Sequence, residues 1–374
     1  MPLYFRSFFN LMLIVVLSDI ASNKSFKLSR LLDAQAVTQK EAKPLGVAVP
    51  EILVATHVAS VSFAQIVNGK LTIAEVFGEQ SAGVPAKRST LYNIASMTKP
   101  ISAEVILRLA SQGKVSLDEP MYTYWTDPDI ASDERRKLLT PRFALSHQTG
   151  FPNWRSETGG RLTFKRMPGT AYGCSGEGLE YVARFAEKKT GQPFETLAQQ
   201  LIFQSSGMTS SAYTKRDWFQ GRIAVPSDGK GRWLDPVMVD KFSAANMVYS
   251  TPLDYAHFLI RVMNGTGLTP TIHAERSRIQ VDHDFKPCTE AWASGCPEEV
   301  GFGLGWEIIK VKGKTFWMHT GRDPGVFTVG FFEPATRTGT IIFTNSDKGA
   351  EVVVPLLHLL GTDPVFIAYL EGQR

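Results

Sequence analysis

Strand-like sequence lies at both ends of the 374-residue chain, and this arrangement limits the possible folds more than any other feature. Residues 56–78, THVASVSFAQIVNGKLTIAEVFG, contain two runs of β-forming residues around an Asn-Gly pair, which is typical of a hairpin turn. After Gly301 further strand-like runs follow in GLGWEIIKVKG, KTFWMHTG, FTVGFFEP and TGTIIFTNS, and then an apolar helix in AEVVVPLLHLLG. The simplest interpretation is one sheet assembled from the two ends of the chain.

Helical patterns occupy the interior of the sequence. Apolar residues recur at helical spacing from Ser96 until Gly113, and helices are also expected in GLEYVARFAEKKTG and TPLDYAHFLIRVMNG. We therefore expect an α/β fold of the α+β type, an antiparallel sheet flanked by helices with a mostly helical insertion. The expected division is a discontinuous sheet domain at 26–116 and 271–374 and a mostly helical domain at 117–270.

The first 25 residues are expected to be a targeting segment. A single positive charge in MPLYFRS is followed by the apolar FFNLMLIVVL and then by the small and polar SDIASN, the order of a secretory signal peptide. The apolar run is shorter than the ~20 residues of a membrane span. We therefore expect a secreted or periplasmic protein. An uncleaved N-terminal anchor is the alternative, and only then is a membrane an expected partner.

Composition and charge exclude several classes of protein. A hydrophobic content of 43%, a charged content of 20% and a formal net charge of +4 describe an ordinary globular chain. Lysines and arginines are scattered, so no nucleic-acid partner is expected. The seven histidines are dispersed without metal-ligand spacing, so neither a metal nor another cofactor is expected.

Three cysteines divide into a candidate pair and a single residue. Cys288 and Cys296 lie eight positions apart in the loop-like segment KPCTEAWASGCPEE, which an oxidising compartment could close into a disulfide. Two free thiols are the alternative. Cys174 is left over.

A Ser-x-x-Lys motif, Ser96 to Lys99, stands at the start of the first predicted helix. Residues three apart on a helix share a face, so the hydroxyl and the amine lie within hydrogen-bond reach. A lysine held away from water loses its proton more easily and can then accept the serine proton. Two further copies, Ser111 to Lys114 and Ser227 to Lys230, fall at a helix end and in a polar loop, where no rigid pair is expected.

A Lys/His-x-Gly pattern on a strand is the second candidate. His319-Thr320-Gly321 follows a strand-like run, and a glycine there allows a substrate to lie close to the backbone. Lys189-Thr190-Gly191 matches the same pattern but ends a predicted helix, where lysine and glycine are ordinary capping residues.

Together with PGTAYGCSGEG (Pro168 to Gly178), these motifs resemble, in order, those of the serine β-lactamase-like superfamily, in its class C and esterase branch. Supporting similarity lies in LLTPRFALSHQTGFPNW, GQPFETLAQQLIFQSSGMTSS, GFGLGWEI and TGTIIFTNS, and the resemblance extends over roughly residues 46–361. It implies an acyl-enzyme on Ser96 with Lys99 as proton acceptor. His319 and Gly321 would border the substrate, and the backbone N–H groups of Ser96 and Arg322 would form an oxyanion hole.

The third motif departs from the family at two positions. The family tyrosine, thought to relay a proton to the leaving group, corresponds to Cys174, and an asparagine two positions later corresponds to Gly176. A cysteine sulfur reaches roughly 3 Å from its Cα against roughly 6 Å for a tyrosine oxygen. A bridging water or Tyr172 could replace the phenol, although the family usually has a buried aromatic residue at the position of Tyr172. A nucleophilic Cys174 is less favoured, because no base nearby in the sequence marks one.

We therefore predict a serine hydrolase with activity lowered or redirected by Cys174. Its expected partner is a small-molecule ester or amide, the amides including β-lactams and D-amino-acid peptides. Esters are favoured because His319 stands where true β-lactamases and penicillin-binding proteins commonly have lysine. The alternative is a ligand-binding or scaffolding homologue that lost turnover, for which Cys174 and Gly176 argue.

Overall fold

The computed structural model describes residues 43–238, 240–283, 285 and 287–373. The strands of its large sheet are β1 (Ser60–Val67), β2 (Lys70–Ser81), β3 (Val84–Pro85), β6 (Val281–Asp282), β7 (Glu299–Phe302), β8 (Glu307–Val311), β9 (Lys314–Asp323), β10 (Val326–Glu333) and β11 (Thr338–Thr344). A separate small ladder pairs β4 (Tyr92–Asn93) with β5 (Tyr249–Ser250). The α-helices are α2 (Leu45–Thr56), α3 (Thr98–Ser111), α4 (Pro141–Leu145), α5 (Gly176–Thr190), α6 (Phe194–Ala198), α7 (Pro252–Met263), α8 (Pro270–Arg276), α9 (Val353–Leu359) and α10 (Pro364–Gly372). The expected signal segment, residues 1–25, lies outside the described residues.

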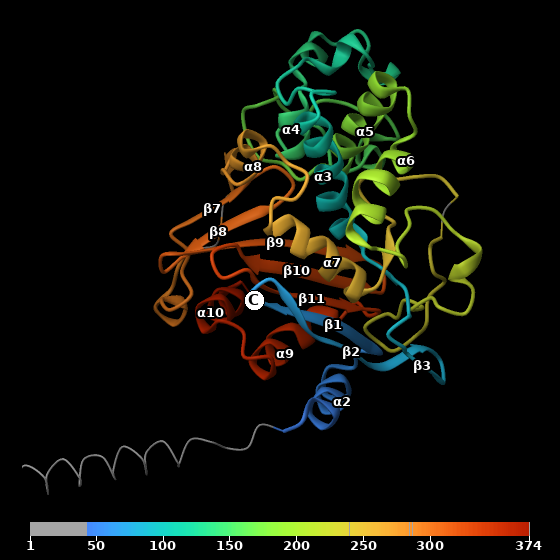
Figure 1. The fold of residues 1–374 in the computed structure, drawn as a ribbon, viewed down its shortest axis with the longest axis vertical. Coiled ribbons are helices and arrows are strands. Elements are labelled where there is room, and N and C mark those ends of the chain that lie inside the picture. Colours follow the sequence, from blue (N-terminus) through green and yellow to red (C-terminus); the bar gives the residue numbers. More distant parts are fainter. Residues whose placement is uncertain (1–42, 239, 284, 286, 374) are drawn as a thin grey trace, which may run out of the picture. The chain divides into compact units, whose positions relative to one another are not determined.

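The two ends of the chain build one antiparallel sheet, with strand order β3-β2-β1-β11-β10-β9-β8-β7-β6 (Figure 1). They meet where β1 pairs with β11, from Val61 opposite Thr344 to Ile66 opposite Gly339. The β1–β2 hairpin turns at Asn68-Gly69, where both residues have positive φ, as a tight hairpin turn requires. The expected α/β fold, with its antiparallel sheet formed by both ends and its mostly helical insertion, is confirmed.

Alternate residues of each strand face different helices, because side chains of a strand point in turn to opposite faces of the sheet. On one face Phe366 of α10 packs against Phe316 of β9 and Phe331 of β10, with ring centroids 4.6 and 4.3 Å apart. On the other face Trp317 packs against Phe332 at 5.2 Å, within the core that also includes α3 and α7. The odd-numbered residues of β9 therefore point towards the helical insertion.

Helix α3 runs through the main core, and its residues are buried for most of its length. An ion pair joins it to α8: Arg276 Nη1 lies 2.6 Å from Glu104 Oε1, and both side chains are 1% exposed. Removing one partner of a buried pair leaves an uncompensated charge, which typically costs about 3–5 kcal/mol. The pair thus joins α3, the helix that follows Ser96, to α8 inside the core. The domain boundaries given above, at 116 and 271, remain a prediction.

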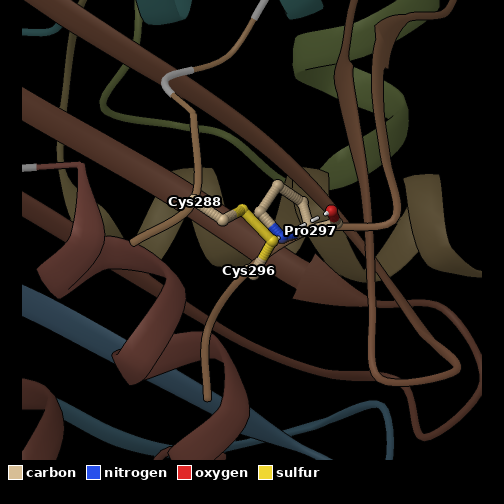
Figure 2. The surroundings of a disulfide bond; sticks show 3 residues. All are labelled: Cys288, Cys296 and Pro297. Atoms are coloured by element: carbon tan, nitrogen blue, oxygen red, sulfur yellow. Dashed lines mark hydrogen bonds between the residues drawn. A yellow bond between two sulfur atoms is a disulfide. The ribbon is translucent and has the colours of Figure 1, made fainter. Parts of the chain in front are cut away.

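Cys288 and Cys296 form a disulfide (Figure 2). The loop that the disulfide closes packs against α10: the Trp292 ring lies 6.3 Å from that of Tyr369. Gly295 lies so close to the α10 backbone that an added Cβ would come within 2.1 Å of it. Cys174 is free and exposed.

Candidate active site

Ser96 lies on a sharp turn between β4 and α3. The turn is a short 3₁₀ helix, Ala95–Met97, and Ala95 has φ of +47°, a left-handed conformation that costs an ordinary residue roughly 1–2 kcal/mol. Asn93 stabilises it, because its Oδ1 accepts a hydrogen bond of 2.8 Å from the Ala95 N–H. This strained turn places Ser96 at the start of the helix that carries Lys99.

Ser96 and Lys99 are in direct contact. The Lys99 amine donates to Ser96 Oγ at 2.7 Å and to the carbonyl oxygen of Ala245 at 3.0 Å. Lys99 is buried, and burial lowers its pKa; Cys174, Glu180 and Asp323, when ionised, partly oppose that shift. The burial therefore favours the neutral amine, the form that can accept a proton from a serine.

Strand β9 lies against the Ser96 turn at Gly321. A Cβ at this position would lie 2.4 Å from the Ile94 carbonyl oxygen and 3.0 Å from the Ser96 nitrogen, so only glycine permits the approach. Strand β8 pairs with β9 no further than Met318. The edge of β9 from His319 onward is thus not paired with β8, and a substrate could lie along it.

The side chains beside Gly321 differ in direction and charge. Burial and the charge of Lys99 lower the pKa of His319 to about 3, so its imidazole is neutral, and its Nδ1 lies 2.8 Å from the Thr320 carbonyl oxygen. The Arg322 side chain instead packs over the Phe327 ring, at 4.9 Å, on the face that carries α9 and α10. The Arg322 side chain thus points away from the Ser96 turn, and the oxyanion role of its backbone N–H stays a prediction.

Cys174 is presented at the site by its neighbours, two residues before α5 begins. The Gly173 N–H donates to the His147 carbonyl oxygen at 2.9 Å, and the Ser175 N–H donates to His147 Nδ1 at 3.1 Å. Because Nδ1 accepts, His147 is neutral, in agreement with a pKa that burial lowers far below its ordinary value. The Trp154 ring lies 5.8 Å from Lys99 Nζ and against Gly176, two positions after Cys174, so the third motif lies near the first.

Tyr172 packs in a cluster of aromatic rings. Its ring centroid lies 4.4 Å from His283, 5.6 Å from Phe302 and 5.9 Å from His147. Burial raises the pKa of its phenol. A phenol that holds its proton this firmly is a poor replacement for a proton relay, and these contacts favour a packing role.

Trp154 explains the glycine that replaces the family asparagine. A Cβ at Gly176 would lie 2.6 Å from the Trp154 ring, and the same ring centroid lies 5.8 Å from Lys99 Nζ. The indole thus occupies the space into which a side chain at position 176 would project. Sequence reasoning did not assign Trp154 to the site, because nothing in the sequence links positions 22 apart.

The other copies of the motifs have structural partners. Ser227 donates to the Asn345 carbonyl oxygen at 2.6 Å, and Ser111 accepts from the Thr269 N–H at 3.1 Å. Lys189 pairs with Glu119 at the end of α5. These three residues make none of the hydrogen bonds described for Ser96 and Lys99.

A carboxylate that sequence reasoning missed lies at the end of β9. Asp323 accepts hydrogen bonds from the side-chain amides of Asn93 and Asn246.

Within the described ranges no three His, Cys, Asp or Glu side chains are grouped to hold a metal ion. In the same part of the chain no helix has both the length and the apolar character needed to cross a bilayer.

The antiparallel sheet with a serine-lysine pair at the head of α3 defines a serine hydrolase of the β-lactamase-like superfamily. The Beta-lactamase family model matches residues 35–360, and the chain belongs to that family.

Several known proteins are similar to this chain. It is 28% identical to esterase EstB of Burkholderia gladioli over 183 residues, which are 41% of this chain and only 45% of EstB. It is 22% identical to the D-alanyl-D-alanine-carboxypeptidase/endopeptidase AmpH of Escherichia coli K12 over 336 residues, 81% of this chain and 85% of AmpH. The octameric penicillin-binding protein homologue from Pyrococcus abyssi has a similar fold, with a TM-score of 0.71, 20% identity and coverage of 86% of this chain and 77% of its own.

Proposed function

We propose that the protein is a serine esterase that acts through an acyl-enzyme on Ser96. The contact that carries this proposal is the 2.7 Å hydrogen bond between Ser96 Oγ and the buried amine of Lys99. A buried amine beside a helix-start hydroxyl can serve as a general base, whereas a structural serine needs no such partner.

The chemical steps follow from these positions. Neutral Lys99 takes the Ser96 proton as Oγ attacks the ester carbonyl, and negative charge develops on the carbonyl oxygen. The N–H groups of Ser96 and Arg322 stabilise that oxyanion, and each such donor typically contributes about 3 kcal/mol. The C–O bond to the alcohol then breaks, the alcohol takes the proton, and a water molecule later hydrolyses the acyl-enzyme to release the acid.

The proton reaches the leaving alcohol from Lys99, either directly or through Cys174 and a bridging water. Cys174 is exposed, so water has access to its thiol. A route with one extra water is less ordered than a phenol in direct contact. We therefore expect modest turnover, and the best substrates should have alcohols that leave without a strong general acid.

Neutral esters suit the charges of the site better than substrates that carry a carboxylate. His319 is neutral, the Arg322 side chain lies on the opposite face of β9, and Asp323 adds a negative charge. β-Lactams and D-alanyl peptides have a carboxylate close to the reacting carbonyl, and β9 offers it no cationic side chain on this face. The partial similarity to EstB agrees with an ester substrate.

A substrate panel tests the proposal. We expect hydrolysis of p-nitrophenyl acetate and butyrate, with kcat/KM for a chromogenic cephalosporin and for D-alanyl-D-alanine peptides at least tenfold lower. Ser96→Ala should abolish all of these reactions. Preferential hydrolysis of the D-alanyl peptides would contradict the ester assignment and would favour a carboxypeptidase instead.

A binding protein without turnover is the second candidate, because Cys174 provides no phenol at the leaving group. Exposure to p-nitrophenyl acetate or a penicillin separates the two. An adduct on Ser96 that persists for hours favours the binding protein, whereas an adduct that forms and is released favours the enzyme.

We also propose that the protein acts outside the cytoplasm, on a small-molecule substrate. Disulfides persist in oxidising compartments, and the Cys288–Cys296 bond fits such a location. The signal-like pattern of residues 1–25 supports the same conclusion. Fractionation of cells that express the full chain tests it, since retention in the cytosol would contradict it.

A further inference from the structure

A single carboxylate connects the three segments that build the site. Asp323 Oδ2 accepts from Asn93 Nδ2 at 2.9 Å, and the two Asp323 oxygens each lie 3.1 Å from Asn246 Nδ2. Both asparagines are buried. Charged acceptors make the stronger hydrogen bonds, typically about twice as strong as neutral ones, so this junction joins β9 firmly to two separate segments.

The first connection leads to the nucleophile. Asn93 donates to Asp323 with its amide nitrogen and accepts from the Ala95 N–H with its amide oxygen, at 2.8 Å. Ala95 is the left-handed residue that immediately precedes Ser96. Asp323 therefore orients the amide that holds the strained turn.

The second connection leads to the base. Asn246 follows Ala245, whose carbonyl oxygen accepts the Lys99 hydrogen bond at 3.0 Å. It precedes Met247, which has φ of +73°, again an unusual left-handed conformation for a residue other than glycine. Both connections from Asp323 thus end beside a strained residue, Ala95 in the first and Met247 in the second. A strained backbone persists only where contacts from the surrounding structure hold it.

We propose that Asp323 is a positioning residue for catalysis, which fixes the nucleophile turn and the lysine-holding loop relative to the oxyanion strand. This inference rests on the proposed function. Among the hydrogen bonds of the described residues, no other single side chain joins the nucleophile turn, the lysine-holding loop and β9. A shift of about 1 Å between reacting groups can reduce a rate about 100-fold, so such a junction affects catalysis without touching the substrate.

The test uses a change of charge and its rescue. Asp323→Asn removes the negative charge of the junction. An oxygen at the Oδ2 position can still accept from Asn93, but the new NH2 group then faces Asn246 Nδ2, so Asn246 must turn its amide over and present its unbonded Oδ1 to keep its contact. In the double variant Asn93→Asp with Asp323→Asn, the negative charge returns at position 93 and each of the two connections regains a hydrogen bond. Asp at 93 then accepts from the Ala95 N–H and from the new amide at 323, whose oxygen accepts from Asn246 Nδ2.

We expect Asp323→Asn to lower kcat for p-nitrophenyl acetate 10- to 100-fold, and the double variant to recover most of that loss. Far-UV circular dichroism and thermal unfolding, measured on all three proteins, separate lost positioning from lost folding. Asp133→Asn is a control outside the junction, because Asp133 accepts hydrogen bonds from Arg135 within its own turn, and it should keep wild-type kcat. If Asp323→Asn misfolds, the double variant alone decides. Activity near that of the wild type supports the proposal that the junction positions the site, and loss of activity in a folded double variant overturns that proposal.

The pH profile provides a second readout that a purely structural role would not move. The titratable groups that influence the pKa of Lys99 are Asp323 on β9, Glu180 on α5 and Cys174 before α5, and Lys99 in turn lowers the pKa of His147 and of His319. Because the Asp323 charge raises the pKa of Lys99, its removal should shift the acid limb of kcat/KM to lower pH. An unchanged profile with unchanged kcat overturns the inference. If the wild-type protein hydrolyses no ester, the proposed function itself is contradicted, and that outcome is distinct from a failure of the positioning role.

Discussion

Gly321→Ala tests whether the close approach of β9 to the nucleophile turn is needed for catalysis. The added Cβ would lie 2.4 Å from the Ile94 carbonyl oxygen and 2.5 Å from Thr328 Oγ1, and ordinary contacts begin at 3.4 Å. The strand must therefore retreat by about 3.4 − 2.4 = 1.0 Å from the Ile94 oxygen. A displacement of about 1 Å in catalytic geometry reduces rates about 100-fold, and loss of one oxyanion donor costs about 100- to 1,000-fold.

We therefore expect kcat for p-nitrophenyl acetate to fall about 100-fold or more in Gly321→Ala, with KM changed far less. Gly229→Ala is the matched control, because its added Cβ would make only an ordinary contact, 3.5 Å from the Lys348 side chain. Thermal unfolding of both variants identifies any general loss of stability. A folded Gly321→Ala variant with kcat within threefold of the wild type would refute the reasoning.

Three further predictions concern the leaving group, the base and the disulfide. Cys174→Tyr should raise kcat for small esters about 10- to 100-fold, whereas Cys174→Phe should not, since only the phenol transfers a proton; equal kcat values would mean that position 174 is not the place of the phenol. Because burial lowers the pKa of Lys99, kcat/KM should reach its plateau well below the ordinary lysine pKa of about 10.4 and fall towards acid pH as Lys99 becomes protonated, and a steady rise to pH 10 would contradict this. Replacing Cys288 and Cys296 with serine should lower the free energy of unfolding by about 2.5 kcal/mol for a loop of eight-residue separation, measured by urea denaturation, and an unchanged value would show that the closed loop adds no stability.

The parts of the site that depend on local spacing could be predicted from the sequence. Ser96 and Lys99 lie one helical turn apart, so their contact follows from helix geometry once the helix is recognised. The Asn68-Gly69 turn likewise determines the β1–β2 hairpin. Strand alternation accounts for His319 and Gly321 on one face and the Arg322 side chain on the other.

The parts that depend on distant contacts could not. Asn93 and Asp323 are 230 positions apart, and an asparagine or aspartate at either place is equally compatible with a surface position. The left-handed conformation of Ala95 has no sequence signal, because alanine rarely adopts it. The fit of Trp154 over Gly176 depends on two segments whose relative placement only the folded structure shows.

The assignment of Ser96 as the acylated residue is tested most directly by mass spectrometry. The protein is mixed with p-nitrophenyl butyrate, quenched in acid within the first turnover, digested and analysed peptide by peptide, with Ser96→Ala in parallel. We predict a mass increase of one butyryl group on the peptide that contains Ser96, and none in the variant. An unmodified Ser96 peptide during active turnover, or a butyryl group on Cys174 instead, would contradict the account.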